Sequence, residues 1–173
     1  MQKVDVSEIA TLLAEVKDSS GGSLPELYRI AWDAYLSTLV GDSGDAFDHN
    51  DFIELRDQGY FPSFEDDPDA NDPVLAMAIG KHYKENYYGN AEGEFVYESD
   101  FQAAHREINQ ETKHFNGKLP PPYVVAWTGR LLGMHQCKVI TDEEYEQLSA
   151  MLPVLEDNPI KIVEAFTKRY ATR

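Results

Sequence analysis

Hydrophobic residues recur at helical spacing along most of the chain. The first run places apolar side chains at positions i, i+3, i+4 and i+7: Ile9, Leu12, Leu13 and Val16. This spacing is typical of one apolar helix face. Asp5 can cap the start of this run, and the Ser-Ser-Gly-Gly sequence at 19–22 ends it. The pattern predicts a short amphipathic helix.

The second run has a broader apolar stripe, which is typical of a core helix. Its members are Leu27, Tyr28, Ala31, Trp32, Tyr35, Leu36 and Leu39. Ser23 and Glu26 have the spacing of a capping box, with Pro25 in the first turn. We therefore expect a helix that begins after Ser23 and ends at Gly41.

The stretch 120–152 predicts a helical hairpin. Its first arm follows a run of prolines and carries a large apolar face: Tyr123, Val124, Trp127 and Leu131. After a polar break at 136–138, Thr141 and Glu144 form a capping box for the second arm. Gly129 and Gly133 are four residues apart, which we interpret as a close approach of a neighbouring helix rather than a self-association face. We expect this hairpin to lie near the centre of the fold.

Four further helices are predicted from caps and apolar spacing. A short one, with Phe52, Ile53 and Leu55, ends at Gly59, and the others are expected at 72–89, from Ser99 to about residue 115, and after the cap at 157–159. The stretch 94–98 has no clear partner strand and is interpreted as a connection. The whole chain, 1–173, is thus predicted to be a compact, single-domain, all-α bundle of about seven helices.

Negative charge is concentrated in one segment. The formal net charge is −16, and residues 42–72 contain 11 acidic residues against one basic residue. Residues 1–41 have 6 acids against 3 bases, and residues 73–173 have 14 against 11. The excess is therefore local, which makes this segment a candidate contact surface. The alternative is that the charge run is an ordinary solvated face of an acidic protein.

Six acids in this segment recur every three residues, and four more follow a cluster of aromatic residues. In a helix, a three-residue step advances about 4.5 Å, which is comparable to the spacing of about 3.4 Å between phosphates along one DNA strand. A regular helix would, however, spiral this row around its axis. We predict that the acids and aromatics form a partner-binding surface: Asp42, Asp45, Asp48, Asp51, Glu54, Asp57, Tyr60, Phe61, Phe64, Glu65, Asp66, Asp67 and Asp69.

Such a surface suits a basic, nucleic-acid-binding protein as partner, because clustered carboxylates attract lysine and arginine and repel nucleic acid. We expect an acidic inhibitor that imitates DNA phosphates, similar in surface type to antirestriction and anti-CRISPR proteins of phages and mobile elements. The single cysteine and the lack of a leader or a long apolar run indicate a cytoplasmic protein without a membrane span.

Catalytic and cofactor motifs are not found. The chain has no glycine-rich phosphate-binding pattern, and calcium loops starting at Asp48 or Asp67 lack the required glycine. Cys137 has basic neighbours that could lower its pKa, but a nucleophile needs further groups. We therefore predict no catalytic residue, no metal site and no cofactor.

Two alternative functions remain open. The first is a protein-interaction module that uses the apolar rim of the hairpin. The second is an all-α enzyme or metal protein that uses Glu107, Glu111 and His114. Glu111 and His114 have the E-x-x-H spacing of di-iron bundles, but this motif occurs once, which favours an exposed polar face at a helix end.

Overall fold

The computed structural model describes residues 3–61, 98–156, 161, 163–165 and 168. All regular structure in these residues is helical, which confirms the predicted all-α class. The elements are α1 (Val6–Ser19), α2 (Glu26–Asp42), the short 3-10 helix η1 (Gly44–Ala46), α3 (His49–Asp57), α5 (Asp100–His114), α6 (Pro121–Gln136) and α7 (Asp142–Ala150). Lys161, residues 163–165 and Lys168 are also helical.

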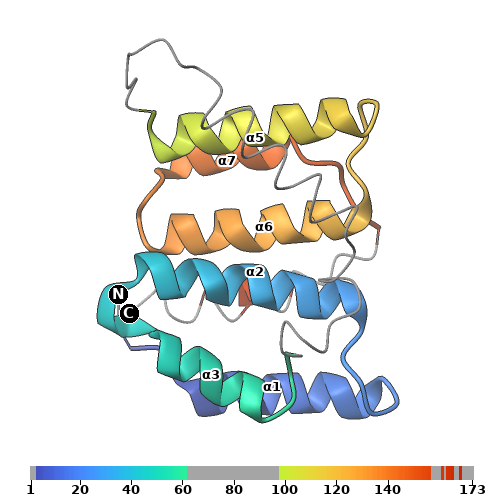
Figure 1. Cartoon of the computed structure of the whole chain (residues 1–173), viewed down its shortest axis with the longest axis vertical. Coiled ribbons are helices and arrows are strands. Elements are labelled where there is room, and N and C mark those ends of the chain that lie inside the picture. Colours follow the sequence, from blue (N-terminus) through green and yellow to red (C-terminus); the bar gives the residue numbers. More distant parts are fainter. Residues whose placement is uncertain (1–2, 62–97, 157–160, 162, 166–167, 169–173) are drawn as a thin grey trace, which may run out of the picture.

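The helices form a stack whose central members are α2 and α6 (Figure 1). Helices α5 and α7 lie on the side of α6, and α1 and α3 lie on the side of α2. The contact between α2 and α6 is the most extensive in the described part of the chain. The first arm of the predicted hairpin is therefore central, but its main neighbour is α2 rather than α7.

Two glycines allow α2 and α6 to approach closely. A Cβ atom at Gly129 would lie 2.4 Å from the carbonyl oxygen of Ala31. A Cβ atom at Gly133 would lie 2.8 Å from Cβ of Thr38. Real side chains do not tolerate such distances, so only glycine fits here. The interpretation of this glycine pair as a helix-packing feature is confirmed.

Helix α6 contributes buried apolar side chains to two hydrophobic clusters, one on each side of it. Val125 and Leu132 belong to the cluster formed mainly by α1, α2 and α3. The second cluster joins α6 to α5 and α7, and its buried members are Ala104, Ile108, Leu119, Val124, Trp127, Leu131, Met134, Ile140 and Leu148. A helix that is apolar on opposite sides is expected in the middle of a domain.

The helix starts largely follow the predicted caps. Asp5 caps α1, and reciprocal capping boxes join Ser99 to Gln102 and Thr141 to Glu144. The box predicted for α2 is wrong, because Pro25 is the N-cap and no side chain caps this helix. A box starting at Ser23 would make Leu24 helical, and the residue before a proline disfavours that conformation.

Several predicted elements lie outside the described residues. These are the helix at 72–89, the stretch 94–98 apart from Glu98, and the cap at 157–159. Among the helices that are described, none is both long enough and apolar enough to cross a membrane.

Candidate functional site: the acidic segment and an adjacent groove

The row of acids from Asp42 to Asp57 follows three different local structures. Asp42 is the last residue of α2, Asp45 lies in η1, and the later acids belong to α3 or its cap. Five of the six side chains are exposed, and Asp51 is half-buried. The three-residue register is therefore helical only within α3, and the six carboxylates do not form one uninterrupted helical row.

Asp48 and Asp51 have a structural role that accounts for part of this register. Oδ1 of Asp48 accepts hydrogen bonds from the backbone N–H groups of Asn50 (2.7 Å) and Asp51 (3.0 Å). Oδ2 of Asp51 accepts one from the backbone N–H of Asp48 at 3.0 Å. The bonds from Asp51 and Asn50 lower the pKa of Asp48 below its usual value. These two acids form the capping box of α3.

Aromatic packing holds α3 against the rest of the molecule. Phe61 is buried, and its ring stacks on Phe52 with a centroid distance of 5.7 Å. Tyr60 is half-buried, and Nζ of Lys17 on α1 lies 5.7 Å from the centre of its ring. Phe61 was predicted to belong to a partner-binding surface, but its side chain is buried in the core, so it anchors the acidic segment and cannot face a partner.

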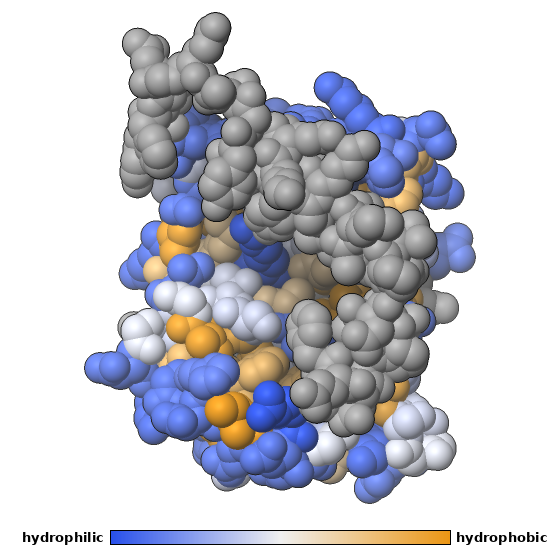
Figure 2. Space-filling view, in the orientation of Figure 1, coloured by the Kyte–Doolittle hydropathy of each residue, from blue (hydrophilic) through white to orange (hydrophobic). Residues whose placement is uncertain are grey.

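The remaining predicted partner-binding residues, Phe64, Glu65, Asp66, Asp67 and Asp69, lie outside the described part of the chain. The exposed acids of α3 are at one end of the stack, where Figure 2 shows mainly hydrophilic surface around α1 and α3.

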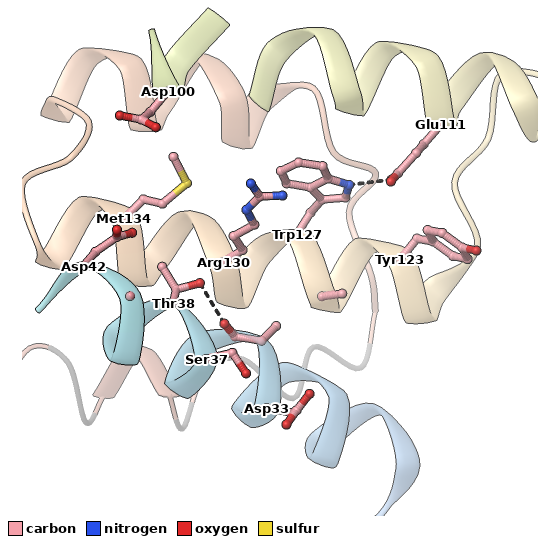
Figure 3. A pocket seen from close by; sticks show the side chains of 13 residues that line it. Asp33, Ser37, Thr38, Asp42, Asp100, Glu111, Tyr123, Trp127, Arg130 and Met134 are labelled. Carbon is pink, nitrogen blue, oxygen red and sulfur yellow. Dashed lines mark hydrogen bonds between the residues drawn. The ribbon is translucent and has the colours of Figure 1, made fainter. Parts of the chain in front are cut away.

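A groove of about 630 Å³ lies between α2, α5 and α6. Its walls combine acidic, small and aromatic side chains, shown in Figure 3: Asp33, Ala34, Ser37, Thr38, Gly41, Asp42, Asp100, Glu111, Tyr123, Ala126, Trp127, Arg130 and Met134. Asp42 thus belongs both to the acidic segment and to this groove. The groove was not predicted from the sequence.

Arg130 and Trp127 occupy the middle of the groove (Figure 3). The Arg130 guanidinium lies 4.8 Å from the Trp127 ring centre and donates a hydrogen bond of 3.1 Å to Oε2 of Glu107. The Glu107 side chain is 8% exposed. Nε1 of Trp127 donates to Oε2 of Glu111 at 2.5 Å. Both glutamates of α5 are therefore directed toward α6.

This arrangement corrects the interpretation of Glu111 and His114 as one exposed polar face. Glu111 is half-buried against Trp127, whereas His114 is exposed and its ring lies edge-on to Phe115. The two residues therefore face different surroundings. In the described part of the chain, no three His, Cys, Asp or Glu residues are grouped to hold a metal ion.

The surroundings of Asp42, at one end of the groove, disfavour its ionised form. Partial burial and the charge of Asp100 raise the pKa of Asp42, and the smaller effect of Arg130 opposes this. Asp42 also ends α2, and the last turn of that helix has no basic residue. Because a helix C-terminus carries partial negative charge, it adds to the negative potential at Asp42.

Cys137 differs from the sequence-based expectation of a lowered pKa. The thiol is half-buried at the end of α6, and burial together with the charge of Asp42 raises its pKa to about 11. It is therefore a poor nucleophile at neutral pH. The basic neighbours in sequence do not determine its surroundings, because Asp42 comes from another helix.

Sequence reasoning missed Arg130, Asp100 and the groove. A partial signal was present: Trp127 and Arg130 are three residues apart on one helix, and Glu107 and Glu111 are four apart on another. Each pair shares a helix face. Without knowing that α5 packs beside α6, the two faces could not be paired.

Comparisons with known proteins give no match: no family model, no curated protein and no solved structure is significantly similar to this chain.

Proposed function

We propose that this protein is an acidic inhibitor that occupies the basic surface of a nucleic-acid-binding protein by imitating phosphate charge. The observation that carries the proposal is the exposure of five carboxylates between residues 42 and 57, a stretch with only one basic residue, Arg56. Arg56 can offset only one of these charges, and its Nε lies 3.9 Å from the exposed Asp57 carboxylate.

The anchored position of α3 supports this proposal. Packed aromatic side chains and the capping box restrict the helix, so its carboxylates are held in a defined arrangement before binding. A preordered charged surface loses less conformational entropy on association than a flexible one. Attraction between opposite charges would also accelerate the encounter with a basic partner. A nucleic-acid-handling partner and a single cysteine favour a cytoplasmic location.

The proposal is tested by charge reversal of residues that do not support the fold. Asp45, Glu54 and Asp57 are exposed and have no capping role, so the variant Asp45→Lys/Glu54→Lys/Asp57→Lys should keep the native circular dichroism spectrum. Asp48 and Asp51 are left unchanged because they cap α3. The matched control reverses three exposed acids outside the acidic segment, Glu143, Glu146 and Glu156.

The tagged native protein is used to capture basic proteins from a host lysate, and double-stranded DNA is then added. Mimicry predicts that DNA releases the captured protein. The segment variant, Asp45→Lys/Glu54→Lys/Asp57→Lys, should capture none of it, whereas the control variant should still capture it. Retention of the same protein by the segment variant would refute the proposed role of these acids.

A further inference from the structure

The end of the groove between Asp42 and Asp100 has two exposed carboxylates on different helices. Asp42 ends α2 and Asp100 begins α5. Figure 3 shows them on either side of the Met134 side chain, which extends from α6. The C-terminal turn of α2 adds partial negative charge at Asp42, whereas the first turn of α5 adds partial positive charge at Asp100. The two full negative charges of the carboxylates outweigh these partial charges, so this end of the groove is suited to a cation.

The groove's own cation does not neutralise these two acids. The Arg130 guanidinium is paired with Oε2 of Glu107 at 3.1 Å and lies over the Trp127 ring. Although Arg130 favours the ionised form of Asp42, the charge of Asp100 has the larger and opposite effect. Among the described residues, neither aspartate belongs to a salt bridge, so a second positive group would gain from both.

The groove is open next to these acids. Gly41 lines it, and a Cβ atom built on Gly41 would have no atom within 4 Å. The neighbouring walls are small or apolar, with Thr38 on α2 and Ala126 and Met134 on α6. A flat group with an apolar stem fits this combination of open space, apolar wall and flanking carboxylates.

We propose that this end of the groove receives an arginine side chain from a basic protein segment, held between Asp42 and Asp100. The inference rests on the proposed function, since it identifies the type of side chain that the basic partner inserts. A guanidinium can donate hydrogen bonds to two carboxylates in different directions, and its faces are weakly hydrated and suit the Met134 thioether. A lysine ammonium offers a more compact and more strongly hydrated charge.

Asp42 connects the two surfaces, because it is both the first acid of the segment and a wall of the groove. A partner that lies along α3 can therefore reach the groove at Asp42. The remaining acids of the segment attract the partner, and the groove selects a side chain.

The experiment is calorimetric titration of the full chain with a short, terminally blocked peptide that carries three arginines, alongside the same peptide with three lysines. The arginine peptide should bind more tightly. The variant Asp42→Asn/Asp100→Asn should weaken its binding about tenfold, as expected for the loss of close charge pairs. The control Glu146→Gln/Glu156→Gln, with the same change in net charge, should alter the affinity less than about twofold.

A neutral variant separates occupation of the groove from general electrostatic attraction. Gly41→Gln places a larger, helix-favouring side chain into the open space without a change of charge, and it should weaken the arginine peptide about fivefold or more. Equal affinities for the two peptides, or unchanged binding by Asp42→Asn/Asp100→Asn and by Gly41→Gln, would overturn the inference. If this happened while the Asp45/Glu54/Asp57 reversal still abolished partner capture, the proposed function would stand without the groove.

Discussion

The Cα of Gly129 on α6 faces the carbonyl oxygen of Ala31 on α2 so closely that an added Cβ would lie 2.4 Å from that oxygen. This relationship brings the two central helices together and thereby positions Arg130 and Trp127 in the middle of the groove. Gly129→Ala should lower the free energy of unfolding by about 1–3 kcal/mol, as overpacking generally does. Urea denaturation measures the change.

The control for this prediction is Gly41→Ala on α2, where the added methyl group meets no atom within 4 Å. Replacing a helical glycine by alanine at an unstrained position should stabilise the protein by about 0.4–1 kcal/mol. Equal effects of the two substitutions would show that helix propensity, and not the α2–α6 contact, determines the cost at Gly129.

The ion pair between Arg130 and the buried Glu107 should stabilise the packing of α5 on α6. Arg130→Met removes the hydrogen bond to Oε2 of Glu107 and should cost about 1.5–3 kcal/mol, the range for hydrogen bonds to charged groups. Adding Glu107→Gln to this variant removes the buried charge and should recover part of the loss. A double-mutant cycle in urea measures the coupling, and simple additivity of the two changes would contradict a direct interaction.

Capping by Asp48 should make the stability of α3 sensitive to acid. Because the folded-state pKa of Asp48 is lowered, its ionised form stabilises the native state above the ordinary value of 3.8, and this contribution is lost as the pH falls through the folded-state pKa. Asp48→Ala should lower the melting temperature at pH 7. Asp48→Asn should retain most of the stability, since asparagine also caps helices.

The difference in melting temperature between native protein and Asp48→Asn should shrink as the pH is lowered below 3.8. Thermal unfolding followed by circular dichroism gives both values. A difference that stays constant down to the lowest pH would argue against a charged cap.

Ionisation of Asp42 should lower the stability of the fold, whereas ionisation of Asp48 raises it. Its folded-state pKa is raised, so the ionised form is disfavoured in the native state and the group destabilises the fold at pH values above its folded-state pKa. The charged groups that act on it are Asp100 on α5 and Arg130 on α6, and Asp42 in turn acts on Cys137. Asp42→Asn should therefore raise the melting temperature at pH 7.

This gain from Asp42→Asn should disappear below pH 3.8, where the native aspartate is protonated in both folded and unfolded states. The same substitution should also let the pKa of Cys137 fall, which a pH series of thiol alkylation would detect. A destabilised Asp42→Asn variant at pH 7 would contradict the described electrostatics of the groove.

Local patterns predicted much of the fold because they depend on neighbouring residues. The apolar spacing around Leu13 and the capping boxes at Ser99 and Thr141 are properties of short segments, and the structure confirms them. The α2 start was misjudged because the effect of Pro25 on Leu24 outweighed the Ser23 signal. The groove depends on which helices pack together, and spacing within single helices does not contain that information.

The acidic segment shows that spacing in the sequence does not reveal the role of a carboxylate. Its three-residue register suggested one functional row, but Asp48 and Asp51 use their carboxylates to cap α3. A short polar residue before a helix can signal a cap or a binding group equally well. Only the hydrogen bonds to backbone N–H groups distinguish these roles, and they leave Asp45, Glu54 and Asp57 for a partner.

The most direct test of phosphate mimicry is a competition experiment in which this protein and a labelled double-stranded oligonucleotide compete for the captured basic protein. Fluorescence anisotropy of the oligonucleotide measures its displacement. Phosphate mimicry predicts that this protein displaces the oligonucleotide completely in low salt (about 50 mM). It also predicts that the affinity of this protein for the captured protein falls roughly tenfold or more at higher ionic strength. Binding that leaves the oligonucleotide in place, with an affinity indifferent to salt, would contradict it and favour an apolar interface on the α6–α7 hairpin.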